Sequence, residues 1–310
     1  MSSRYHRALV LVALLAAGCG RASAKDEASA ERGGGSVARG GVSAEHRALR
    51  VCADPNNLPF SNRRMEGFEN RIAELVGRSL NEPVEYTWWA QRRGFVRNTL
   101  GAHACDVVIG ITTADEQVLA TAPYYSSSYV FVSRRDRGYH IRSFDDPRLR
   151  TLTIGIHVIG DDYNALPPGV ALARRGMIRN VRGYSIYGNY AEESPPSALI
   201  RAVEHGDVDV AIAWGPLAGY YAQRSRVPLE VTPVAPRMAT PGIPFVYSIS
   251  MGVRHGDTLR KAELERVLAQ HHAEVQRILR DYGVPLASDT DVATRAPAEA
   301  AVAVRGEPWH

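Results

Sequence analysis

The chain has 310 residues, of which 45% are hydrophobic and 23% are charged, and its formal net charge is +4 at pH 7. This length allows one large domain or two of ordinary size, and the composition is that of a globular protein with a buried core. Arginines supply nearly all of the positive charge but are interleaved with Asp and Glu along the chain, which argues against the one-sided basic face of a nucleic-acid binder.

The N-terminus has the pattern of an export signal. Arg4 and Arg7 precede an uncharged apolar run at residues 8–17, and small residues then lead to Cys19. This order of segments is typical of a secretory signal peptide, which we assign to residues 1–19. The apolar run is too short to cross a bilayer as a helix, and no later segment reaches that length. We therefore predict no transmembrane helix in the mature protein.

The end of this segment, LAAGC at residues 15–19, resembles a bacterial lipobox. That resemblance implies that Cys19 is lipidated and becomes the first mature residue. The large aliphatic residue of the motif stands one place early, at Leu15, so ordinary cleavage is the alternative. Either outcome predicts a periplasmic protein, and a lipid on Cys19 is its only predicted contact with a membrane.

Two flanking segments lack the periodicity of a helix or a strand. Residues 20–47 are small and polar, which predicts a flexible tether. Residues 287–310 are rich in Ala, Pro and Val, and we predict a mobile tail there. The folded part is therefore expected between residues 48 and 286.

The first half of this part alternates short apolar strands with helical patterns. We predict strands at 49–53, 84–88 and 106–111, a helix whose apolar face repeats over 68–80, and a second helix at 95–100. The third strand is almost entirely apolar, as expected for a strand that is covered on both faces. This order predicts parallel pairing with right-handed crossovers.

The pattern then restarts with a second α/β unit. The predicted strands are 129–132, 152–156, 180–184, 208–214, 229–234 and 245–253, and the predicted helices are 169–175, one opened by Ser194 as N-cap and Pro195, one from Pro216, and 259–282. The second unit therefore lies between two long strands. We predict two lobes, 48–133 with 248–286 and 134–247, joined by crossing strands near 129–132 and 247–253. A cleft lies between the lobes, at the carboxyl ends of the strands.

This layout resembles the type II periplasmic substrate-binding proteins of ABC transporters. A narrower resemblance rests on LRVCADPNNLPFS (49–61), GFEN (67–70), YTWWAQRRGFVRN (86–98), CDVV (105–108), VIGDDYN (158–164), YG (187–188) and AWGPLAGY (213–220). These motifs are similar to those of the quinoprotein dehydrogenase-associated binding proteins of the MoxJ/XoxJ type. The resemblance implies a role beside a PQQ-dependent, methanol-type alcohol dehydrogenase and its cytochrome c. It leaves open whether that role is solute binding, maturation or activation.

Two cysteines remain after Cys19. In this fold class the first and third strands are neighbours, so Cys52 in the first and Cys105 at the start of the third are expected to form a disulfide in an oxidising compartment. Two buried free thiols are the alternative.

The first group of candidate binding residues follows the first strand. Asp54, Asn56 and Asn57 can hold a polar ligand, with Phe60 as an apolar wall. A turn that merely caps the strand is the alternative.

A second group follows the next strand, where tryptophan and arginine side chains typical of binding hot spots lie close together. We expect Trp89 and Arg93, with Arg92 beside them, to face the cleft or a partner. Strand alternation places one of the two neighbouring tryptophans in the core.

The remaining candidates lie at other strand ends. Thr112, Tyr124, Asp162 and Trp214 complete the predicted ligand or partner surface. The segment 110–117 resembles the amino-acid-binding subgroup, in which an Arg at the position of Gln117 clamps the ligand carboxylate. A neutral amide cannot form that charge-assisted pair, which argues against ordinary amino-acid transport.

Catalytic patterns are missing from the sequence. There is no G-x-S-x-G elbow, no H-E-x-x-H and no calcium loop, and His271 and His272 are adjacent on a predicted helix, unlike a metal pair at i and i+4. We predict no catalytic residue, no metal and no cofactor. The main hypothesis is an accessory partner of the dehydrogenase. A solute receptor of an ABC importer for a small polar metabolite is the alternative, and a small-molecule lyase is the weaker third.

Overall fold

The computed structural model describes residues 47–159, 164–186, 190–239 and 242–287. All of them fall within one compact unit, which is described here by itself. The predicted signal peptide, the lipidation site Cys19, and nearly all of the predicted tether and tail lie outside the described residues.

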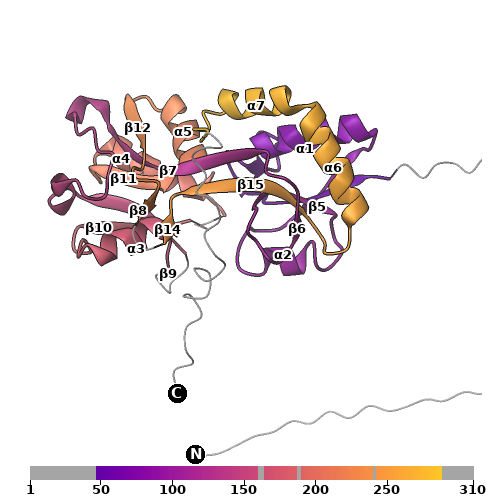
Figure 1. Ribbon diagram of the computed structural model, residues 1–310. Coiled ribbons are helices and arrows are strands. Elements are labelled where there is room, and N and C mark those ends of the chain that lie inside the picture. The colour runs from indigo at the N-terminus through magenta and orange to yellow at the C-terminus, as the bar shows by residue number, and fades with distance from the viewer. Residues whose placement is uncertain (1–46, 160–163, 187–189, 240–241, 288–310) are drawn as a thin grey trace, which may run out of the picture. The chain divides into compact units, whose positions relative to one another are not determined.

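Lobe 1 contains a parallel core of three strands, in which β1 (Leu49–Ala53) lies between β4 (Val84–Trp88) and β5 (Val107–Thr112). Its helices are α1 (Phe68–Leu80), α2 (Phe95–Asn98), α6 (Thr258–Gln270) and α7 (His272–Asp281), and its short strands are β2 (Asn56–Asn57), β3 (Ser61–Asn62) and β6 (Leu119–Ala120). The helix α1 packs against α6 and α7 (Figure 1). These elements and their parallel pairing agree with the periodicity of the sequence.

Lobe 2 repeats this plan, with β8 (Ile154–Ile159) between β10 (Val181–Ser185) and β11 (Val210–Trp214), all parallel. The other elements are α3 (Pro167–Arg174), α4 (Ala198–His205), α5 (Gly215–Arg224), β9 (Asn164–Ala165), β12 (Leu229–Pro233), β13 (Met238–Ala239) and β14 (Ile243–Pro244), with single 3₁₀ turns at Arg135–Arg137, Pro147–Arg150 and Pro195–Ser197. Each lobe has its own buried apolar clusters.

Two long strands, β7 (Tyr125–Arg134) and β15 (Val246–Val253), run side by side between the lobes (Figure 1). The first half of β7 pairs with β15, and the second half pairs with β11 and β12 of lobe 2. The strand β15 in turn pairs with β5 of lobe 1. The hydrogen-bonded order is therefore continuous, β10-β8-β11-β7-β15-β5-β1-β4, because the two linking strands pair with each other as they cross between two separate cores.

Two local predictions are wrong. The expected helix at 259–282 is two helices, because His271 has φ −106° and ψ 20° and ends α6 before α7 begins. The apolar side chains on either side keep helical spacing, so the sequence does not mark the break. Ser194 is not a helix N-cap: it has φ 49°, its side chain makes no capping bond, and a 3₁₀ turn separates it from α4.

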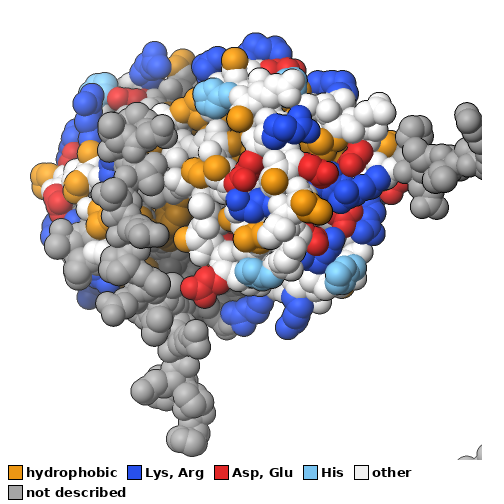
Figure 2. All heavy atoms as spheres, turned by 45° about the vertical axis from the view of Figure 1, so that its right-hand side comes forward, with side chains coloured by type: hydrophobic (Ala, Val, Ile, Leu, Met, Phe, Trp, Pro, Cys, Tyr) orange, Lys and Arg blue, Asp and Glu red, His pale blue; other side chains and the backbone are white. Residues whose placement is uncertain are grey.

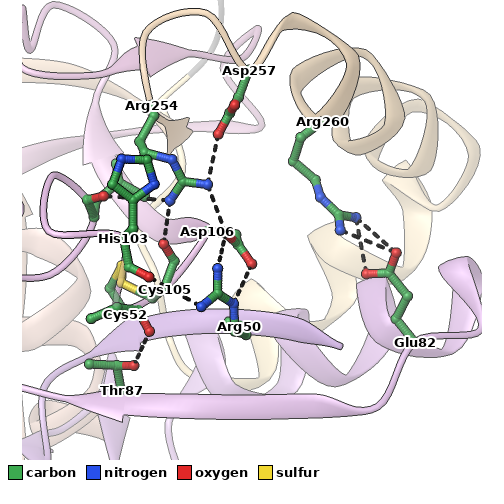
Figure 3. Close-up of polar contacts among 12 residues, drawn as sticks. Arg50, Cys52, Glu82, Thr87, His103, Cys105, Asp106, Arg254, Asp257 and Arg260 are labelled. Atoms are coloured by element: carbon green, nitrogen blue, oxygen red, sulfur yellow. Dashed lines mark hydrogen bonds and ion pairs between the residues drawn. A yellow bond between two sulfur atoms is a disulfide. The ribbon is translucent and has the colours of Figure 1, made fainter. Parts of the chain in front are cut away.

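The predicted disulfide is confirmed. Cys52 and Cys105 are bonded, with 5.4 Å between their Cα atoms, and they join β1 to the start of β5. Beside the disulfide, Asp106 accepts hydrogen bonds from Arg50 at 2.8 and 2.7 Å and from Arg254 at 2.8 Å (Figure 3). Burial raises the pKa of Asp106, but the bonds from the two arginines outweigh that effect and hold it below its usual range.

Candidate functional site

A cavity of about 720 Å³ lies between the lobes, within the size range of small-molecule sites. The residues that follow or end β1, β5, β8 and β11 line it, together with side chains of β7 and β15. In open α/β sheets, ligands bind beyond the carboxyl ends of the parallel strands. The predicted position of the cleft therefore agrees with the structure.

Four predicted residues of the loop after β1 line this cavity, namely Asp54, Asn56, Asn57 and Phe60. The carboxylate of Asp54 is already occupied, because it accepts bonds from the backbone N–H groups of Asn56 at 2.8 Å and Gln91 at 2.7 Å and from the hydroxyl of Tyr190 at 2.5 Å. Asp54 is therefore held by the protein itself.

Contacts between the lobes continue along this loop. The side chain of Asn56 donates to the carbonyl of Glu192 at 2.7 Å and accepts from the N–H of Ser194 at 3.0 Å. Arg64 forms an ion pair with Glu193. Burial, followed by the bond to Asp54, raises the pKa of Tyr190, so its hydroxyl stays protonated as a donor. The lobes thus touch along one side of the cleft.

The loop after β4 divides its predicted residues between two surfaces. Arg92 and Arg93 are exposed and line the cavity, and the guanidinium of Arg92 lies 5.0 Å from the centre of the Tyr190 ring. Trp89 is 47% exposed and is not among the residues that line the cavity. The neighbouring Trp88 stacks on Tyr86 with ring centres 4.7 Å apart, as strand alternation predicted for one of the pair.

The other predicted residues have different positions. Thr112, Trp214 and Gln117 line the cavity. Tyr124 does not reach it: the side chain is buried in the core of lobe 1, and its hydroxyl donates to the carbonyl of Ile109 at 3.0 Å. Tyr124 precedes β7, and its ring contacts that of Tyr125, with centres 5.0 Å apart, within the same core cluster. Asp162 lies outside the described residues.

Three aromatic side chains of the cleft wall, Tyr125, Tyr129 and Tyr247, were not among the predicted site residues. Tyr125 and Tyr129 are four residues apart on β7 and share a face, and Tyr247 of β15 pairs with Ser127 between them. The rings of Tyr129 and Tyr247 also pack edge-to-face on Trp214, with centres 5.5 and 5.9 Å from it. The polar-aromatic run YSSSY at the start of β7 was the available signal for Tyr125 and Tyr129.

Two titratable groups at the cavity, the buried His157 and the half-buried Glu69, were also missed. His157 on β8 borders the cavity, and burial lowers its pKa to about 4 although its ring nitrogen lies 3.0 Å from the carbonyl of Pro196. Glu69, the second residue of α1, lines the cavity, and burial followed by the charge of Asp54 raises its pKa to about 8. The sequence presents Glu69 only as an acid in the first turn of a helix.

Across 47–159, 164–186, 190–239 and 242–287, no three or more His, Cys, Asp or Glu side chains are grouped so that they can hold a metal ion. Over the same ranges, every helix is too short or too polar to span a membrane. On the face drawn in Figure 2, arginines lie beside acidic side chains and do not form a patch of one sign.

Comparison with known proteins gives a match over most of the chain. The pattern of the bacterial extracellular solute-binding proteins, family 3, matches residues 49–284. Protein MoxJ of Methylorubrum extorquens is 31% identical over 278 residues, which cover 88% of this chain and 91% of that protein. Protein MoxJ of Paracoccus denitrificans is 28% identical over 254 residues, which cover 77% and 88%.

Solved structures agree with this match. The periplasmic binding protein XoxJ from Methylobacterium extorquens AM1 has a TM-score of 0.65 and 35% identity, over 78% of this chain and 100% of that one. MxaJ of a Methlophaga species has a TM-score of 0.65 and 26% identity, over 77% and 100%. An ancestral cationic amino-acid-binding protein, with a TM-score of 0.59 and 18% identity, shares the fold alone. The two-lobed type II fold and the similarity to MoxJ/XoxJ-type proteins are thereby confirmed.

Proposed function

We propose that this chain, which belongs to the bacterial extracellular solute-binding proteins of family 3, is an accessory protein of a periplasmic PQQ-dependent alcohol dehydrogenase of the methanol type. It binds the dehydrogenase and promotes its maturation or activity without turning over substrate. The observation that carries this proposal is the similarity to MoxJ and XoxJ over most of the chain.

The same proposal includes the route to the periplasm. Residues 1–19 act as the export signal, and a lipid on Cys19 with residues 20–47 as a tether lets a membrane-bound protein reach a soluble partner. The cytochrome c that accepts electrons from the dehydrogenase is a second candidate partner. The lobes are proposed as 48–133 with 248–286 and 134–247, with 287–310 as a mobile tail.

The loop after β4 is the proposed contact with the dehydrogenase. Trp89 exposes 47% of its surface, and Arg92 and Arg93 are exposed beside it. Tryptophan and arginine dominate protein-binding hot spots because one side chain supplies both apolar area and directed hydrogen bonds. Because Trp89 is exposed and lies outside the cleft, it is better placed to contact a partner protein than a solute bound inside the cleft.

The experiment is a pull-down of the dehydrogenase with the exported protein, followed by Trp89→Ala and Arg93→Ala. Each variant should lower the affinity at least tenfold, the effect of losing a hot-spot side chain. Leu259→Ala and Arg277→Ala, which remove an exposed apolar and an exposed basic side chain on α6 and α7, are the matched controls and should bind normally. A deletion strain should contain dehydrogenase of reduced activity.

A solute receptor of an ABC importer is the second candidate. It is favoured by the cavity of about 720 Å³ between the lobes and disfavoured by Gln117, which cannot clamp a ligand carboxylate. Normal dehydrogenase maturation in the deletion strain, together with micromolar binding of a metabolite, would replace the first proposal with this one.

A further inference from the structure

The carboxylate of Glu69 differs from that of Asp54, the other acidic side chain at this end of the cleft. No hydrogen bond or ion pair joins its side-chain oxygens to another residue within the described ranges, although its backbone N–H donates to the carbonyl of Phe60 at 2.9 Å. By contrast, Asp54 accepts three hydrogen bonds from the protein. An unpartnered carboxylate inside a protein is costly unless something else supplies a partner.

The fold makes room for this side chain. Gly110 on β5 faces it, and a Cβ atom at that position would lie 2.0 Å from an oxygen of Glu69. Both residues line the cavity, so the carboxylate borders the space between the lobes. A partner for it can therefore enter from the cleft.

Aromatic rings cover the walls on either side. Phe60 and Tyr125 line the same cavity as Glu69, and both pack edge-to-face on Phe68, the residue before it. Tyr129, Trp214 and Tyr247 continue the wall along the linking strands. The faces of such rings attract organic cations, most strongly where water is excluded.

We infer that the cleft binds a small organic ammonium cation, with the carboxylate of Glu69 as its counter-charge and these aromatic rings as its wall. This inference goes beyond the proposed partnership with a dehydrogenase and does not depend on it. The acidic side chains Asp54 and Asp115 also border the cavity, and the two arginines that line it, Arg92 and Arg93, are exposed side chains of one loop. His157, whose pKa is lowered to about 4, is neutral at pH 7 and does not repel a cation.

Binding should release a proton. The pKa of Glu69 is raised to about 8, so at pH 7 the carboxyl is mostly protonated and must ionise to pair with a cation. Asp54, from the loop after β1, is the charge that acts on Glu69, and Glu69 in turn acts on the hydroxyls of Tyr86 on β4, Tyr125 on β7 and Tyr124 just before it. Burial raises the pKa of all three tyrosines, so they stay neutral near pH 7.

The test is calorimetry and tryptophan fluorescence on the full exported chain, with choline and tetramethylammonium as permanent cations and 3,3-dimethylbutan-1-ol as the neutral isostere of choline. We expect saturable binding of at least one cation, and at least tenfold weaker binding of the alcohol. Glu69→Gln should weaken cation binding at least tenfold, while Glu85→Gln, at an exposed position on β4, should leave it unchanged. The binding enthalpy should depend on the buffer for the native chain and not for Glu69→Gln.

A second variant guards against a folding defect. Gly110→Ala keeps the acid but displaces its carboxylate, so it should also weaken cation binding, with far-UV circular dichroism unchanged. Equal or tighter binding of the alcohol, unchanged affinity in Glu69→Gln, or no binding of either cation at millimolar concentration would overturn the inference. The pull-down of the dehydrogenase would be unaffected by any of these results.

Discussion

Two carboxylates at opposite ends of the lobe 1 sheet have opposite environments. Asp106, beside the disulfide at the start of β5, receives hydrogen bonds from two arginines, and its pKa is lowered. Glu69, at the cleft end, has no partner within the described residues, and its pKa is raised. One end of the sheet is built for stability, and the other keeps an unsatisfied group where a ligand can meet it.

The largest expected effect comes from removing the disulfide at the stable end. The bridge joins residues separated by 53 positions, and a loop of that size corresponds to roughly 4 kcal/mol on the chain-entropy model. The double variant Cys52→Ser, Cys105→Ser should therefore lose about that free energy of unfolding in urea titrations. Reducing the native chain should reproduce the loss, and the absence of any change would show that the bridge does not stabilise the exported protein.

Next in size is Asp106→Asn. The change leaves Arg50 and Arg254 without their shared carboxylate, and we expect a loss of about 2–3 kcal/mol, reduced from that of a fully buried pair because Arg50 is partly exposed. The stabilisation by a lowered pKa is present at neutral pH and is lost as the pH falls below the ordinary value of 3.8. Thermal melts from pH 2 to 7 should show less acid sensitivity in the variant than in the native chain.

Glu69→Gln should have the opposite effect on stability and raise it at high pH. An acid whose pKa is raised in the folded state binds its proton more tightly when folded, so its contribution is greatest below about pH 4.5 and falls as the pH rises toward about 8. At pH 8.5 we expect the variant to be more stable than the native chain by about 2 kcal/mol, less than full burial allows because the cleft admits water. Thermal melts of both chains at pH 7 and 9 check this, because His157 is neutral at both values. An equal change in stability between pH 7 and 9 in the two chains would contradict the prediction.

The smallest expected loss of stability concerns Asp54. This residue lies at the cleft end of the sheet, but its carboxylate accepts hydrogen bonds from the protein, as that of Asp106 does. Tyr190→Phe removes one of its three bonds and a contact between the lobes, so we expect a loss of about 1 kcal/mol. Small-angle scattering should also report a more open cleft. Tyr184→Phe, on β10 of lobe 2, is the matched control and should change neither quantity.

The sequence alone determined most elements of the fold and the position of the cleft. Apolar periodicity is set by neighbours within one helix or strand, so β1, α1, β4 and β5 could be predicted closely. The pairing of Cys52 with Cys105 needed the family resemblance, which supplied the order of the strands. Asn56, Arg93 and Trp214 could be assigned to the cleft because they follow or end strands of the two lobes.

Only the tertiary structure decided which polar groups are satisfied. Glu69 resembles a solvated helix acid until Gly110, from a distant strand, is brought against it, and Tyr124 resembles a cleft residue until its hydroxyl reaches the carbonyl of Ile109. At the break between α6 and α7, the ring of His271 lies 3.1 Å from the hydroxyl of Ser79 on α1, and both helices pack against α1. These outcomes rest on contacts between residues far apart in the chain, and local periodicity carries no information about such contacts.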